Sequence, residues 1–305
     1  MGQGKPVVLR TREWLRRLSA VAVGLPSLLA ATPSFSATQT LAPSDDTFIN
    51  SGNADNNNGG SSSVFTGTDG HGGTMRALVR FAMPAGLQGR ATITNVQLRL
   101  TLRALGNGTV GQAAVDTLQA VTQPWIQGNG TGEAPSAFTV GQPCSGTIIG
   151  ATWNQTNCAT STAWTTAGGT VVASPSGQAD TTGVGDGAPV IWDSASNPAM
   201  VGDVQSWIDA PANNDGWRVA SSTEGVVGGA QRFYSTEADM FVPSLTVTYA
   251  CKPGFVEVGT SCAAAPQTVP AAPSWALALL AVALGATALV ALRRGRSNRS
   301  SRFVS

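Results

Sequence analysis

Charged residues are scarce in this sequence, and most of the basic ones are gathered at its two ends. Only 11% of the 305 residues are charged, well below the roughly 25% of an ordinary soluble domain. Ten of the 18 lysine and arginine residues lie in the two terminal segments, so the middle carries eight basic against 16 acidic side chains. Because nucleic-acid binders need a basic face to neutralise phosphates, this distribution argues against that class of partner.

Histidine is almost absent, which limits the catalytic chemistry. The one histidine, His71, is flanked by glycines, whereas a Ser-His-Asp triad needs a histidine held by packing and by a carboxylate. No nucleophile elbow, Walker loop or dinucleotide fingerprint occurs. A polysaccharide-cleaving enzyme would need a carboxylate pair, and Glu133, Glu224 and Glu237 are candidates, but no spacing singles out two of them.

The first 37 residues have the three-part layout of a secretory signal peptide. A basic stretch ends at Arg17, an apolar run covers residues 18–31, and small residues up to Ala37 offer a cleavage site. An uncleaved N-terminal anchor is the alternative, but so short an apolar run barely spans a bilayer. We therefore predict export, with signal peptidase as a processing partner.

A second apolar run, residues 275–292, contains neither a charge nor a proline. As a helix rising about 1.5 Å per residue it would be about 27 Å long, just enough to cross the hydrocarbon layer. Five arginines follow it, and the positive-inside rule keeps such a tail cytoplasmic. We predict a transmembrane helix over 275–292 and a basic cytoplasmic tail over 297–305, with the body tethered outside the inner membrane.

Residues 269–296 resemble a sorting signal. The positions that carry the resemblance are Val269, Pro270, Trp275, Arg293 and Arg294. They are similar to the PEP-CTERM class, in particular to its IPTL-CTERM variety with the motif Ile-Pro-Thr-Leu-Ser-Glu-Trp, although residues 271–274 depart from that motif. The resemblance implies an exosortase-like membrane enzyme that cleaves near the motif and passes the body to the cell surface or extracellular matrix.

The body, residues 38–250, consists of short runs in which apolar and polar side chains alternate. Clear runs cover residues 77–82, 96–103 and 245–249, and joints rich in Gly, Asn and Ser separate them. Many short strands with polar turns are typical of an all-β fold. We predict an antiparallel β-sandwich of the jelly-roll kind.

One short helix is expected near residue 200. Asn197 is placed to cap it, Pro198 suits its first turn, and Trp207 lies on its apolar face as an anchor against the sandwich.

The four cysteines agree with export. Proximity favours pairing Cys144 with Cys158 and Cys251 with Cys262, although four cysteines allow three pairings. The second pair would tie a small hairpin over residues 251–268. Zinc binding is the alternative, but CxxC spacing is missing and an exported protein meets oxidising conditions.

Further stretches of the body share the pattern of one known family. They are residues 46–49, 56–63, 78–81, 97–102, 152–154, 203–207, 214–216, 232–238 and 243–247. Together they resemble the DNRLRE-domain family, a β-sandwich of secreted bacterial proteins that is grouped with carbohydrate-binding modules. Thr236 stands where that family usually has Arg, and Ala82 where it prefers Asp, and both changes remove charge that would serve a ligand or an ion pair.

Glycan binding relies on aromatic platforms with hydrogen-bonding groups around them. Of the six tryptophans in the body, we expect Trp153 and Trp207 in the core. Trp164 and Trp217 lie beside polar or turn residues and are the predicted ligand-binding platforms, with packing in the core as the alternative.

A structural calcium ion is the one cofactor that the sequence suggests. Asp45, Asp46, Asp55 and Asn56 offer oxygen ligands, but they lack EF-hand spacing. Solvated turn residues are the alternative interpretation.

These patterns predict an exported, non-catalytic surface or matrix protein that binds extracellular polysaccharide. The main alternative is a purely structural or adhesive envelope protein without a glycan site. A polysaccharide-degrading enzyme is a third, less favoured alternative.

Overall fold

The computed structural model describes residues 36–105, 110–132 and 141–267, and residues 273, 275–276, 278–284 and 286–289 further on. The signal peptide predicted over residues 1–37 lies outside this range except for its last two residues. Val269, Pro270, Arg293, Arg294 and the basic tail also lie outside the described residues.

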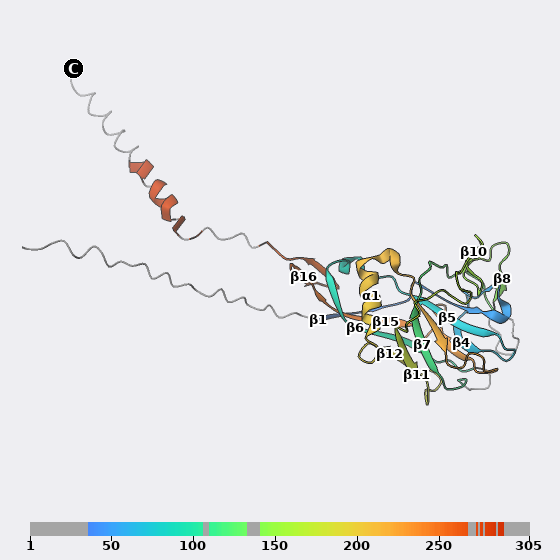
Figure 1. The fold of residues 1–305 in the computed structure, drawn as a ribbon. Helices are drawn as coiled ribbons and strands as arrows, with labels where there is room; N and C mark the ends of the chain where they lie inside the picture. Colours follow the sequence, from blue (N-terminus) through green and yellow to red (C-terminus); the bar gives the residue numbers. More distant parts are fainter. Residues whose placement is uncertain are drawn as a thin grey trace, which may run out of the picture. The chain divides into compact units, whose positions relative to one another are not determined.

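Two antiparallel sheets build the body (Figure 1). The first has the strand order β1 (Ser36–Leu41), β15 (Ser244–Cys251), β6 (Ala91–Thr101) and β12 (Pro189–Asp193). The second has the order β11 (Gly177–Asp180), β7 (Val115–Ala120), β13 (Trp217–Ser221), β5 (Thr74–Arg80), β4 (Ser63–Thr68) and β14 (Gln231–Tyr234), and β2 (Asp45–Asn50) also pairs with β5.

The main core receives side chains from both sheets. Phe48, Val79 and Phe233 come from the second sheet, whereas Leu98 and Trp192 come from the first, and all five are buried in one apolar cluster. A core shared by two antiparallel sheets is the arrangement of a β-sandwich. The predicted all-β, antiparallel fold is therefore confirmed, and it is sandwich-like.

The strand β6 follows the period-two pattern that predicted it. Val96, Leu98 and Leu100 are buried, while Gln97 and Arg99 between them stay partly exposed.

The strand β5, by contrast, is buried on both faces. Ala77, Leu78 and Val79 are consecutive and all are buried, because a second apolar cluster covers the outer side of this sheet. Leu78 belongs to that second cluster, whereas Ala77 and Val79 belong to the main core. The double burial explains why the sequence alternates less cleanly here.

The predicted helix is α1 (Ala199–Asp209), and it packs on the core through Met200, Val204, Trp207 and Ile208. Trp207 meets Trp217 edge-on, with ring centroids 4.5 Å apart. The expected side-chain cap at Asn197 was wrong.

The amide of Asn197 is engaged elsewhere, which is why it cannot cap α1. Its Oδ1 accepts a hydrogen bond from the Gln178 backbone N–H (2.8 Å), and its Nδ2 donates to the carbonyls of Gln178 (3.2 Å) and Asp193 (3.1 Å). These bonds tie the start of the helix to the edge strand β11.

Residues 121–132 and 141–172, called the covering segment below, cover the outer face of β2 and β5. Its short pairings join β3 (Asn56–Asn57) to β8 (Gln142–Pro143), and β9 (Gln155–Asn157) to β10 (Thr162–Ala163). Single 3-10 turns lie at η1 (Ser51–Asn53), η2 (Ala85–Leu87) and η4 (Pro211–Asn213).

Both predicted disulfides are present. Cys144 bonds to Cys158 within the covering segment, and Cys251 bonds to Cys262. The second bond ties the antiparallel hairpin of β16 (Phe255–Val258) and β17 (Ser261–Ala264), as expected for the end of the body.

Toward the C-terminus, residues 275–276, 278–284 and 286–289 are helical. Among the residues that the structure describes, no helix is long and apolar enough to cross a membrane. The span predicted over 275–292 includes residues outside the described ones and stays a prediction.

Candidate functional site

Neither of the two tryptophans predicted as glycan platforms is exposed. Trp164 is 5% exposed and Trp217 is fully buried. Trp217 lies at the start of β13 and points into the main core, where its Nε1 donates to Asp203 Oδ2 of α1 (2.8 Å). Trp164 lies in the second cluster, and its Nε1 donates to the carbonyl of Thr152 (2.9 Å). The expected exposure was therefore wrong, because both rings pack against other elements.

The remaining tryptophans of the body are also used for packing. Trp125 and Trp192 are buried, and each indole N–H donates to a backbone carbonyl, that of Asp215 (2.7 Å) and Asp116 (3.0 Å) respectively. Trp207 is in the main core as expected.

Arginine side chains join the covering segment to the sheet beneath it. The guanidinium of Arg76 lies 4.9 Å from the ring centroid of the half-buried Trp153, and Arg80 lies at the same distance from Trp125. Arg76 also makes a bidentate ion pair with Glu224, with both N–O distances at 2.8 Å. These cation–π contacts and the ion pair stabilise the outer layer, and each guanidinium covers one face of its tryptophan ring.

The four residues predicted as calcium ligands each have another partner. Asp45 pairs with Arg80 at 2.8 Å, and Asp55 accepts a hydrogen bond from Asn154 Nδ2 at 2.9 Å. Asn56 Nδ2 donates to the carbonyl of Gly141 at 3.5 Å. Within the described ranges, no group of three or more His, Cys, Asp or Glu side chains is arranged to hold a metal ion.

Asp46, the fourth of these residues, is buried against the loop that follows β14. Its Oδ2 accepts hydrogen bonds from the Thr236 backbone N–H (2.8 Å) and the Thr236 hydroxyl (2.7 Å). Burial, and then the neighbouring charge of Glu237, raise the pKa of Asp46 to about 7.

The carboxylates weighed for catalysis are also engaged. Glu224 is held by Arg76, and Glu237 accepts a hydrogen bond from Gln127. Asp46 lies near Glu237 but is only 2% exposed, which keeps it away from a bound polymer. Glu133 lies outside the described residues.

One aromatic pair does reach the surface. Tyr234 ends β14 and Phe241 lies in the loop before β15, and their ring centroids are 5.1 Å apart at an interplanar angle of 57°. Phe241 is 41% exposed and is the one exposed aromatic side chain in the described part of the body. This pair is therefore the candidate for the platform that the tryptophans do not provide.

Polar groups border the Tyr234–Phe241 pair. The guanidinium of Arg103 lies 5.0 Å from the Tyr234 ring centroid, and its Nη1 donates to Ser62 Oγ (2.9 Å) and Ser63 Oγ (2.8 Å). These bonds hold the charged group over one face of the Tyr234 ring. Stacking surface next to a positioned hydrogen-bonding group is the combination that sugar recognition requires.

The backbone of Phe241 is strained, with φ of +57°. A bulky residue in this left-handed region costs of order 1–3 kcal/mol, and such strain is concentrated at functional sites. Beside it lies Gly187, where an added Cβ would be 3.9 Å from the edge of the Phe241 ring. The sequence signal for this site is the apolar dipeptide Met240-Phe241, which lies between the mainly polar residues 235–239 and β15.

Comparison with known proteins supports a carbohydrate-binding domain. Residues 37–131 match the sequence model of carbohydrate-binding module family 96. The match covers less than half of the chain, from β1 through β7, and includes Arg103 but not Tyr234 or Phe241. No curated protein matches the chain. The DNRLRE resemblance and the C-terminal sorting signal stay predictions.

Proposed function

We propose that this protein is an exported, non-catalytic polysaccharide-binding protein whose contact surface is the Tyr234–Phe241 pair. The match to a carbohydrate-binding module family supports the ligand class. The observation that carries the site is the exposure of Phe241 in a body whose tryptophans are all buried or half-buried.

The chemistry of the pair suits a sugar ring. The C–H face of a pyranose is apolar and stacks on an aromatic ring, while its hydroxyls need donors and acceptors at the edge. Phe241 and Tyr234 supply the apolar area, and Arg103 and the Tyr234 hydroxyl supply polar groups. Taking the value for aromatic pairs within proteins, each ring that stacks on a sugar should contribute about 0.5–1.5 kcal/mol to the free energy of binding.

Export and sorting complete the proposal. Signal peptidase would remove residues 1–37, and an exosortase-like enzyme at the inner membrane would process the chain near residues 269–275, releasing the body to the surface or matrix. The two disulfides support passage through an oxidising compartment. Mass spectrometry of the protein from surface and membrane fractions tests this, because an intact leader on all of it would contradict export.

The binding test is affinity electrophoresis of the full chain, purified in mild detergent, through gels that contain alginate, a soluble cellulose derivative or the host's own exopolysaccharide. We expect retardation by at least one polymer and its loss in Phe241→Ala and Tyr234→Ala. Val227→Ala, which changes an exposed side chain on a different loop, is the matched control and should keep the retardation. Equal retardation of all four proteins would contradict the proposed site.

A structural or adhesive protein without a glycan site is the second candidate. The burial of five of the six body tryptophans favours it, because this leaves a single exposed aromatic side chain in the described body. Absence of retardation in every polymer gel would support it. Release of reducing ends or unsaturated sugars from any polymer would instead indicate an enzyme.

A further inference from the structure

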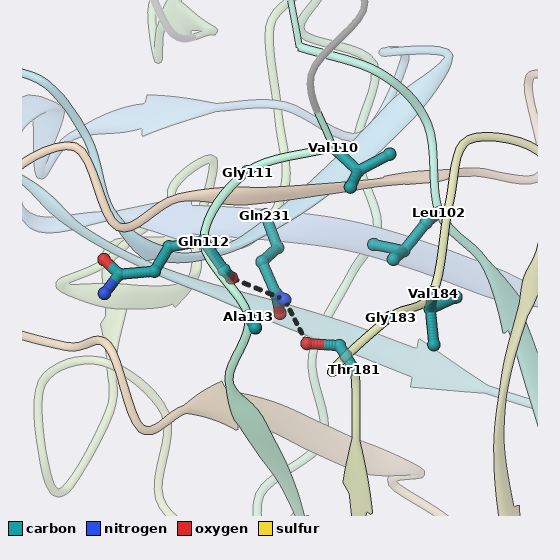
Figure 2. Close-up of a pocket in the computed structure, with 9 residues that line it drawn as sticks. All are labelled: Leu102, Val110, Gly111, Gln112, Ala113, Thr181, Gly183, Val184 and Gln231. Carbon is teal, nitrogen blue, oxygen red and sulfur yellow. Dashed lines mark hydrogen bonds between the residues drawn. The ribbon is translucent and has the colours of Figure 1, made fainter.

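A pocket of ≈ 290 Å³ lies beside the first residue of β14, between the end of β6 and the segments around residues 110–113 and 181–184. Figure 2 shows the amide of Gln231 between Gln112 and Thr181, with the side chains of Leu102, Val110 and Val184 grouped on one side. The pocket is distinct from the aromatic pair. Side chains alternate along β14, so Gln231 points inward with Phe233 whereas Tyr234 points outward.

The hydrogen bonds of Gln231 fix the orientation of its amide. Nε2 donates to the carbonyl of Gln112 (3.0 Å), which has no proton to give, and to Thr181 Oγ1 (2.6 Å). The hydroxyl of Thr181 gives its one proton to the carbonyl of Ala114 (3.0 Å), so it too accepts from Gln231. Both neighbours therefore require the nitrogen, and an exchange of oxygen and nitrogen is ruled out.

This orientation leaves an acceptor without a donor. Gln231 is 1% exposed, and its Oε1 is buried with no hydrogen-bond partner among the described residues. A buried polar atom left unsatisfied costs about 1–3 kcal/mol, so a ligand or water that donates to it is favoured. The acceptor is preformed, because Gly111 forms a β-bridge with Gln231 that holds one wall of the pocket in place.

The lining also defines the charge of the ligand. None of the lining residues is ionisable. In the sequence, the exposed Asp180 and Asp186 flank residues 181–184, while Arg103 and Arg232 adjoin Leu102 and Gln231 and direct their guanidinium groups to Ser63. An anionic group would lose its hydration in this pocket without a counter-ion in the lining, whereas a neutral molecule with hydroxyl groups would contact the apolar walls and donate to Oε1.

We infer that this pocket binds a single neutral sugar residue, such as the end of a glycan chain, through a hydroxyl that donates to Gln231 Oε1. The choice of sugar among neutral hydroxylated ligands rests on the proposed function. The inference adds a second site, for neutral rather than acidic sugars, to the surface platform.

The test uses the full chain in mild detergent and saturation-transfer NMR with D-glucose, D-galactose, D-mannose and D-glucuronate. We expect saturable binding of at least one neutral hexose, with glucuronate at least tenfold weaker. Ala113→Trp would fill the pocket from an exposed lining position and weaken hexose binding at least tenfold. Ala212→Trp, on the exposed turn η4, is the matched control and should leave it unchanged.

Gln231→Met removes the acceptor, and a loss of hexose binding with the fold intact supports the assignment. The absence of saturable binding of every neutral hexose to the wild type would overturn the inference. Hexose binding that survives Ala113→Trp, or glucuronate binding as tight as that of the hexose, would also overturn it. Phe241→Ala separates this inference from the proposed function, because it should weaken polysaccharide retardation while hexose binding in the pocket persists.

Discussion

Asp116 makes the stability of the fold depend on pH in a direction opposite to that of most surface carboxylates. It lies in β7, fully buried, and its Oδ1 accepts a hydrogen bond from Thr66 Oγ1 (3.4 Å). Its Oδ2 has no partner within the described ranges. Burial raises the pKa of Asp116 to about 7, and hydrogen bonds from Ser221 and Thr66 offset this only in part.

The sign follows from proton binding. Between pH 4 and pH 7 the folded state keeps the proton on Asp116 while the unfolded chain, with an ordinary aspartate pKa of about 3.9, releases it. The stabilisation from this group is therefore fully present below about pH 4, and it is lost as the pH rises toward 7. At about 1.4 kcal/mol per pKa unit, the loss is on the order of 4 kcal/mol as an upper value.

Asp116→Asn should remove this dependence. The asparagine carbonyl can still accept from Thr66 and Ser221, but the side chain no longer titrates. Urea unfolding followed by tryptophan fluorescence at pH 5 and pH 8, with the disulfides intact, measures the free energy of unfolding. The wild type should lose up to about 3 kcal/mol more than the variant between the two pH values, because the loss accumulates at about 1.4 kcal/mol per pH unit from pH 5 to about pH 7.

The control for this experiment is Asp180→Asn, which changes an exposed carboxylate. Its free energy of unfolding should change between pH 5 and pH 8 by as much as that of the wild type, because Asp116 is still present. The reasoning would be refuted if the free energy of unfolding of Asp116→Asn changed between pH 5 and pH 8 by as much as that of the wild type.

Three other outcomes are expected. Thr236→Arg should place a cation against Asp46 and lower the pKa of that carboxyl. In the same urea assay, the free energy of unfolding of this variant should therefore fall less between pH 5 and pH 8 than that of the wild type. Replacing Cys144 and Cys158 together by serine should cost about 3 kcal/mol by opening a short loop, measured as a lower Tm. Trp164→Ala should destabilise the fold by about 3–5 kcal/mol, seen by urea unfolding; a loss of glycan affinity without a loss of stability would contradict its packing role.

Local signals in the sequence predicted much of the fold. The alternation around residues 96–103 depends only on one strand having a buried and an exposed face, which β6 has. The disulfides join cysteines 14 and 11 positions apart, so proximity in sequence sufficed. The apolar face of α1 was likewise visible as helical spacing.

The site was harder to predict because its exposure depends on distant parts of the chain. Trp164 is buried only because the covering segment packs on β2 and β5, and no local pattern encodes that layer. Asn197 would cap α1 if the edge of β11 did not use its amide first. Phe241 looks like a core residue by type, and its positive φ and surrounding loop are what leave it exposed.

The most direct test of the central claim is the equilibrium affinity of the wild type and Phe241→Ala for whichever polysaccharide retards the protein, measured by isothermal titration calorimetry. The account predicts about a tenfold weaker Kd for Phe241→Ala, the equivalent of about 1.4 kcal/mol, with Val227→Ala equal to the wild type. Identical affinities for all three proteins would contradict it.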